Sequence, residues 1–177
     1  MYLLILTLWA KRTILISSGG NTATDNTAQS GNLGVNIMAN TVTAKIYGPA
    51  QKMRFMPYAF AEFYLQAENY VYSFMKKYAV GYDGGCWEYI TYENGACAFI
   101  APDGYQLTLP NYFDEPVSAK EAGIIVALYA YSHFCCVAFE RGWQRVNETM
   151  AERYHTLRDF TETLPPESQS RIFRAID

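Results

Sequence analysis

The polar side chains whose types suggest catalysis are few and scattered along this 177-residue chain. Asp83 and Glu88 lie close together in the sequence and could act as a general acid and base. His155 could join them, or could activate the thiol of Cys135 or Cys136 as a nucleophile. No motif ties these residues together, and a thiol inside an apolar helix is usually inert. A small hydrolase built on Asp83, Glu88 and His155 is therefore the alternative hypothesis, and the leading one is not an enzyme.

Two further patterns could hold a phosphate or a metal ion. Gly81, Gly84 and Gly85 form a glycine-rich stretch, but phosphate loops lead from a strand into a helix and carry a GKS or GxGxxG pattern. These glycines lead into a predicted strand. His133 and Cys136 lie one helical turn apart, but no CxxC or HExxH pattern accompanies them. We interpret the first pattern as a tight turn and the second as packing, and expect no cofactor and no metal.

A long apolar stretch, residues 118–141, is the element around which the others must be arranged. Ser118 and Glu121 form a capping box, which predicts where a helix begins. Arg141 and Gly142 predict where it ends. The stretch has no broad polar face, so it should be surrounded by other elements. A membrane span would have similar length, but charged amphipathic segments without a basic anchor cluster flank this one, which favours burial inside a soluble domain.

The rest of the chain predicts an α+β fold: a small antiparallel β-meander of three to four strands, packed with three to four helices around a buried central helix. The other predicted elements are a short edge strand over 41–47, a helix over 57–79, a hairpin within 81–102, a third meander strand over 105–109, an amphipathic helix over 143–160 and a terminal helix over 167–176. In the hairpin, Asn94–Gly95 predicts a type I′ turn that pairs Tyr92 with Cys97 and Ile90 with Phe99.

Composition and charge exclude some classes of function. The formal net charge is -3. A duplex-DNA binder normally needs a basic patch, and a mimic of the DNA backbone needs a dense array of carboxylates. The sequence has neither excess, so a sequence-independent DNA binder is only a third hypothesis and strong direct DNA binding is not expected.

The first forty residues differ in character from the rest. Residues 1–17 make a poor signal peptide, because the basic residues follow the apolar run and no cleavage site is clear. Residues 17–40 are rich in Ser, Gly, Asn and Thr. We expect a leader over 1–40 that is disordered or loosely attached, a single domain over 41–177, and a start at Met38 as an alternative to Met1. The four cysteines fit thiols in a reducing compartment.

Seven segments resemble, in order and spacing, the ArdB/KlcA antirestriction family. They are RFMPYAF (54–60), VYSFMKKY (71–78), GYDGGCWEYITYENGACAFIAP (81–102), NYF (111–113), SAKEAGIIVALYAYSH (118–133), YHTLRDF (154–160) and IFRAID (172–177). The GGxWEY hairpin and the terminal IFRAID are the most specific pair. Departures are Cys86, where an aromatic residue is more usual, and Cys97 and Ala98, which replace bulkier residues. The first forty residues have no counterpart.

The resemblance implies a non-catalytic protein of plasmids or other mobile elements, which inhibits type I restriction endonucleases in the bacterial cytoplasm and protects incoming DNA. Its expected partner is the type I restriction-modification complex, either in general or only when that complex is bound to DNA, and no membrane is involved. The expected working surface is the hairpin tip or the charged side of the last helices, with the candidate residues Tyr92, Asn94, Gly95, Arg158, Asp159 and Asp177.

Overall fold

Helix α4 (Ala119–Glu140) begins at the predicted capping box in the computed structural model, which describes residues 44–47 and 51–177. The backbone N–H of Ser118 donates to the Glu121 carboxylate at 2.7 Å, and the Ser118 hydroxyl accepts from the Glu121 N–H at 3.3 Å. Gly142, with φ of 69°, follows the end of the helix in the left-handed conformation. Both predicted ends of the helix are therefore confirmed.

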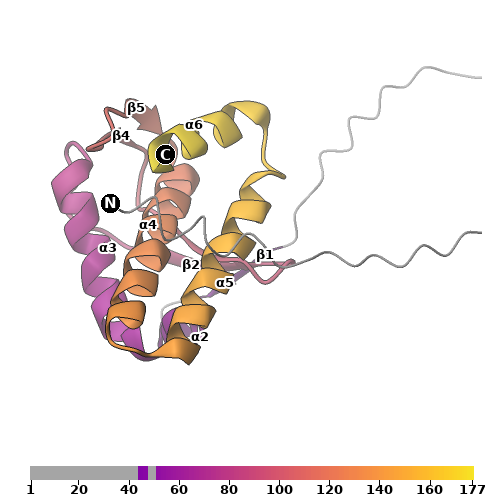
Figure 1. Cartoon of the computed structure of the whole chain (residues 1–177). Helices are drawn as coiled ribbons and strands as arrows, with labels where there is room; N and C mark the ends of the chain where they lie inside the picture. Colours follow the sequence, from indigo (N-terminus) through magenta and orange to yellow (C-terminus); the bar gives the residue numbers. More distant parts are fainter. Residues whose placement is uncertain (1–43, 48–50) are drawn as a thin grey trace, which may run out of the picture. The chain divides into compact units, whose positions relative to one another are not determined.

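Other elements cover α4 on several sides. It packs against β3 (Cys97–Ile100), α3 (Tyr64–Tyr78), α5 (Gln144–Thr161) and α6 (Pro166–Ile176). Figure 1 shows it running between α3 and α5 with α6 near one end. Gly123 allows the close approach to β3, because a Cβ there would lie 1.9 Å from the carbonyl oxygen of Phe99. In the described part of the chain, α4 is the one helix long and apolar enough to cross a bilayer, and 61% of its most apolar window is buried inside the protein. These contacts favour a core helix.

The predicted helix over 57–79 is divided. Helix α2 (Lys52–Phe60), a short 3-10 turn η2 (Ala61–Phe63) and helix α3 (Tyr64–Tyr78) follow one another. The break is at Ala61, whose φ of 47° and ψ of -129° cannot occur inside an α-helix. The break places Phe60 against Tyr131 and Phe63 against Phe134, with ring centroids 4.7 and 4.8 Å apart. Burying both rings on α4 offsets the backbone strain.

The strands form two antiparallel sheets. Strands β1 (Ala44–Tyr47), β2 (Glu88–Tyr92) and β3 (Cys97–Ile100) make a three-stranded sheet in the order β1-β2-β3, which confirms the edge strand. The α+β class is also confirmed. Strand β4 (Tyr105–Thr108) does not extend that sheet as predicted, but pairs with β5 (Asp114–Val117). Directly after β3, Ala101 donates its N–H to the Ala119 carbonyl at the start of α4, and β4 itself bonds to Val80, whose N–H donates to the Gln106 carbonyl.

The turn between β2 and β3 differs from the predicted type I′ turn. Tyr89 pairs with Phe99 and Thr91 pairs with Cys97, one residue away from the predicted register. The loop is therefore three residues long, and its left-handed position is Gly95, with φ of 83°. The extra residue frees Asn94 for other contacts: its Oδ1 accepts from the N–H of Ala96, and its Nδ2 donates to the carbonyl of Thr156.

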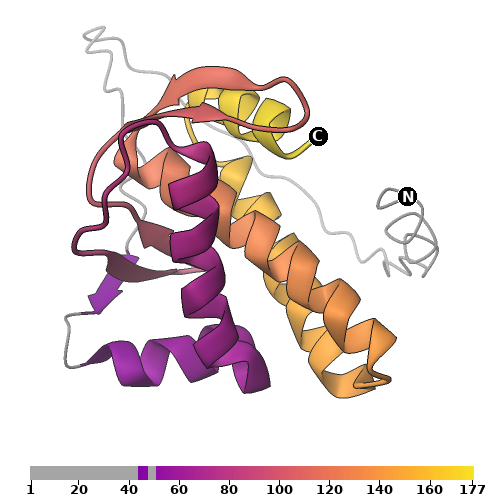
Figure 2. The ribbon, with the colours of Figure 1, turned by 90° about the vertical axis from the view of Figure 1, so that its left-hand side faces the viewer.

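The two C-terminal helices, α5 (Gln144–Thr161) and α6 (Pro166–Ile176), are close to the predicted ranges. Ile172 is fully buried on α6, as expected for a docked terminal helix. Figure 2 shows the β4–β5 hairpin curving over α6. The predicted leader lies outside the described residues and stays a prediction.

Candidate interaction surface

Helix α5 contacts both regions in which we expect the working surface, the tip of the β2–β3 hairpin and the charged side of the last helices. Asn94 Nδ2 donates to the Thr156 carbonyl at 3.1 Å, so the β2–β3 tip lies on α5. Asp159 comes three residues after Thr156 and therefore lies on the same side of the helix. Arg158 is on another side, with its guanidinium 5.3 Å from the ring centroid of Phe173 on α6. We call Asn94, Gly95 and Asp159 the tip patch.

Two more of the candidate residues belong to a second patch, where α5 meets the end of α6. Arg158 and Asp177 are both close enough to act on the Tyr154 hydroxyl: burial raises the pKa of Tyr154, the charge of Arg158 lowers it, and that of Asp177 raises it. We call Arg158 and Asp177 the C-terminal patch. Arg158 also lies 3.8 Å from Glu162, an exposed pair that contributes little to stability.

Tyr92 is not exposed, which corrects the expectation of an open aromatic at the hairpin tip. Its side chain is 3% exposed and stacks on Phe160, with ring centroids 3.6 Å apart. Burial raises the pKa of its hydroxyl well above the usual range, and that hydroxyl has no hydrogen-bond partner among the described residues. Lys120 Nζ lies 5.4 Å from the ring centroid. Tyr92 is thus a packing residue that holds the tip patch on α5.

Arg153, on α5, contacts the β2–β3 turn, although an arginine in an amphipathic helix is usually expected on the solvated side. Its guanidinium lies 4.2 Å from the ring centroid of Tyr58 and donates to the carbonyls of Tyr58 and Gly95 at 3.3 and 3.5 Å. The spacing along the helix could have indicated this position, because Arg153 is one turn from both Met150 and Leu157, which are fully buried.

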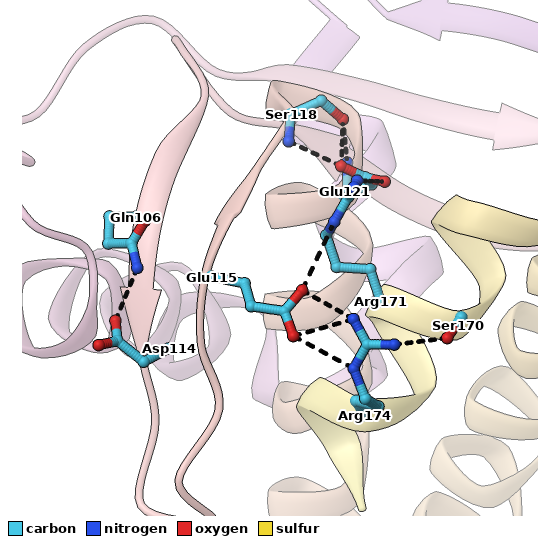
Figure 3. Close-up of polar contacts among 8 residues, drawn as sticks. All are labelled: Gln106, Asp114, Glu115, Ser118, Glu121, Ser170, Arg171 and Arg174. Carbon is cyan, nitrogen blue, oxygen red and sulfur yellow. Dashed lines mark hydrogen bonds and ion pairs between the residues drawn. The ribbon is translucent and has the colours of Figure 1, made fainter.

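Ion pairs fasten α6 to its neighbours (Figure 3). Arg171 Nη1 donates to Glu121 Oε1 at 2.7 Å, and Arg174 Nη2 donates to Glu115 Oε2 at 2.7 Å. Burial by itself raises the pKa of Glu121, but hydrogen bonds from Ser118 and Ser168 and the charge of Arg171 lower it on balance. Both arginines of the terminal helix are therefore engaged by carboxylates of this chain.

The three residues of the alternative enzyme hypothesis, Asp83, Glu88 and His155, do not bond to one another in the described part of the chain. Asp83 lines a cleft of about 370 Å³ together with Tyr72, Lys76, Tyr82, Gly84 and Gly85. Glu88 is exposed at the start of β2. His155 is exposed on α5, and its ring contact is with Tyr154. Across residues 44–47 and 51–177, no hydrogen bond or ion pair links any two of Asp83, Glu88 and His155.

Of the other candidate ligands, His133 is exposed on α4 and Cys135 and Cys136 are half-buried, so the packing expected of them is only partial. The ring of His133 stacks on that of Tyr70 at 4.8 Å, and burial lowers the pKa of His133. Burial raises the pKa of the Cys135 and Cys136 thiols. Where the structure is described, no group of three or more His, Cys, Asp or Glu side chains is arranged to hold a metal ion.

The fold and these two patches define an α+β domain that offers polar contacts along α5 and at the end of α6. The chain belongs to the antirestriction protein family, which matches residues 80–177 and confirms the resemblance inferred from the motifs. It is 34% identical to the YfjX protein of Escherichia coli K12 over 135 residues, covering 72% of this chain and 82% of that protein. It is 30% identical to the antirestriction protein KlcA of Escherichia coli over 144 residues, covering 77% of this chain and 94% of that protein.

A solved structure shares the fold. It matches with a TM-score of 0.65 and 30% sequence identity, over 81% of this chain and the whole of the other. That structure is described as showing a novel fold of the KlcA and ArdB proteins and antirestriction activity against type I DNA restriction systems in vivo but not in vitro.

Proposed function

We propose that this chain is the antirestriction protein of a mobile element, which inhibits the host type I restriction endonuclease and so protects incoming DNA. The observation that carries the proposal is the match to the KlcA and ArdB fold over the whole of that chain, at 30% identity. We further propose that it acts in the bacterial cytoplasm through a domain over residues 41–177, with residues 1–40 as a leader.

We propose binding, not catalysis, as the means of inhibition. Asp83 lines a cleft, whereas His155 is exposed on α5, where its ring contacts that of Tyr154. Cys97 is buried, and burial raises the pKa of its thiol, which makes it a poor nucleophile. These separations favour a protein that acts by contact with another macromolecule.

The partner we propose is the restriction complex, and the charges argue against direct binding to DNA alone. A phosphate backbone is bound by arginine and lysine side chains that are free to neutralise it. Arg171 and Arg174 are instead paired with Glu121 and Glu115. We propose the tip patch and the C-terminal patch as contact surfaces, with Tyr92 as the residue that positions the first.

The test is the plating efficiency of unmodified phage on cells that carry a type I restriction system, with and without the protein. Expression should raise plating toward the level of a restriction-deficient strain. Asp159→Lys and Arg158→Glu should each reduce the relief. Arg145→Glu is the matched control, because Arg145 is exposed on the same helix about 20 Å from Arg158. Unchanged restriction with the wild-type protein would refute the proposal.

The alternative hypothesis is tested in the same assay. A triple variant, Asp83→Asn with Glu88→Gln and His155→Ala, should keep full relief, because none of the three groups is placed in either contact patch. Loss of relief in this variant, at unchanged thermal stability, would favour the enzyme. Duplex binding by the purified protein at low salt would favour a DNA-binding mechanism instead.

A further inference from the structure

Tyr112 is the most exposed large hydrophobic side chain in the part of the molecule that the structure describes. It is 98% exposed, at the tip between β4 and β5. Its φ is 67°, in the left-handed region that glycine and asparagine adopt readily and aromatic residues rarely do. The ring buries almost no surface against residues 44–47 and 51–177, so no packing contact with them offsets the backbone strain.

The backbone beneath Tyr112 is held from several directions. Asn111 Nδ2 donates to the carbonyls of Arg174 and Ala175 at the end of α6, at 3.0 and 3.2 Å, and Asn111 Oδ1 accepts from the N–H of Phe113 at 3.2 Å. The N–H of Leu109 donates to the Phe113 carbonyl at 2.8 Å, and the Phe113 side chain is buried. The backbone that carries Tyr112 is therefore held in place, so little backbone freedom is lost when the ring binds a partner.

Strain in a non-glycine residue, held in place by its surroundings, is a feature of binding sites. Tyrosine is also one of the side chains that contribute most at the centre of protein interfaces. Tyr112 fits both descriptions, because its strained backbone is held by its neighbours and its ring is exposed and outside the core.

The surroundings of Tyr112 are acidic. Asp114 is exposed, and hydrogen bonds from Gln106 and Thr108 lower the pKa of its carboxyl, which keeps it ionised. Asp177 follows two residues after Ala175, to which the tip is bonded. Figure 2 shows the hairpin and the C-terminal end of α6 side by side. The nearby cation of Arg174 is paired with Glu115.

We propose that Tyr112 is the anchor of a docking surface, which inserts into an apolar pocket with a basic rim on a protein partner. The inference rests on the proposed function, and within it the partner is a subunit of the type I restriction complex. Nucleic acid is the less suitable partner, because its phosphates would meet the carboxylates of Asp114 and Asp177.

Tyr112→Asn separates binding from folding, because asparagine tolerates the left-handed conformation. The thermal midpoint should stay the same or rise by about 2 to 4 °C. Relief of restriction should fall at least about ten-fold, as for loss of an interface anchor. Tyr112→Phe, which keeps the ring, should retain most of the relief. Phe139→Ala is the matched control, because Phe139 is 61% exposed on an ordinary helical backbone, and it should leave relief unchanged.

The partner is identified by cross-linking in cells that carry the type I system with tagged subunits. A photoreactive p-benzoylphenylalanine in place of Tyr112 should cross-link to a tagged subunit, and the same group in place of Phe139 should not. Full relief with Tyr112→Asn beside an active wild type would overturn this inference alone. A wild type without relief would overturn the proposed function and this inference together. Cross-linking at position 112 only to a second copy of the chain, or to DNA, would overturn the assigned partner.

Discussion

Arg171 Nη1 donates a hydrogen bond to Glu121 Oε1 at 2.7 Å and joins the last helix of the chain to the first turn of α4. The Glu121 side chain is 5% exposed and that of Arg171 is 29% exposed. Glu121 also completes the capping box with Ser118. One carboxylate thus fixes the start of the central helix and the position of α6 (Figure 3).

Removal of Arg171 should destabilise the protein strongly. Arg171→Ala leaves the buried carboxylate of Glu121 without its cation, which should lower the free energy of unfolding by about 2 to 3 kcal/mol. Urea denaturation followed by circular dichroism measures the change. The control is Arg145→Ala, on the exposed side of α5, which should change stability by less than about 0.5 kcal/mol. Equal effects of the two substitutions would show that the Glu121 pair is not needed.

The pH dependence of stability should contain a contribution from Glu121. The folded-state pKa of this group lies below its ordinary value of 4.5. Its contribution is therefore fully present above that value and is lost as the pH falls through the lowered pKa. Glu121→Gln should have a flatter dependence of unfolding free energy on pH between about pH 5 and pH 3. Urea denaturation midpoints of the wild type and the variant across this pH range measure the difference. An identical pH dependence of stability in the two proteins would contradict the contribution of Glu121.

Gly123→Ala should be the more damaging of two glycine substitutions. The added Cβ would lie 1.9 Å from the Phe99 carbonyl oxygen, so α4 and β3 must move apart at a loss of about 3 kcal/mol. In Gly142→Ala the added Cβ would have no neighbouring atom within 4 Å. The left-handed backbone conformation alone should then lower the free energy of unfolding by about 1 kcal/mol. Thermal and urea unfolding measure the stability of both variants against that of the wild type. A larger loss for Gly142→Ala would contradict the close approach of α4 to β3.

Tyr92 should tolerate loss of its hydroxyl but not of its ring. The hydroxyl is buried without a partner among residues 44–47 and 51–177, so Tyr92→Phe should leave stability equal or up to about 1 kcal/mol higher. Tyr92→Ala removes the stack on Phe160 and should cost about 3 to 4 kcal/mol. Chemical denaturation of both variants measures this. A marked loss of stability in Tyr92→Phe would reveal a hydrogen bond to the hydroxyl.

Thiol labelling should distinguish Cys86 from the other three cysteines. Cys86 is exposed and Cys97 is buried, while burial raises the pKa of the Cys97, Cys135 and Cys136 thiols. A chromogenic disulfide reagent should therefore react rapidly with one thiol per chain, and Cys86→Ser should remove this fast phase. Full reaction of the remaining thiols should require denaturant. Fast labelling of Cys97 in the folded protein would contradict its burial.

Sequence alone was sufficient for the features that depend on neighbours along the chain. The capping box at Ser118 and Glu121 and the left-handed stop at Gly142 are local, since each is built from residues within a few positions of one another. The apolar stretch of α4 and the presence of a hairpin around Asn94 and Gly95 follow from local pattern in the same way. The family was identified from short motifs in their order, and the comparison over residues 80–177 agrees.

Only the tertiary structure decided which faces and partners these elements have. Asn94 lies in a three-residue turn, and its side chain bonds to Thr156 on α5, a residue 62 positions away. Tyr92 is buried because Phe160 covers it, and Tyr112 is exposed because Asn111 is tied to the end of α6. Such contacts join segments far apart in the chain, and their free energy outweighs local preference. Periodicity along the sequence carries no information about them.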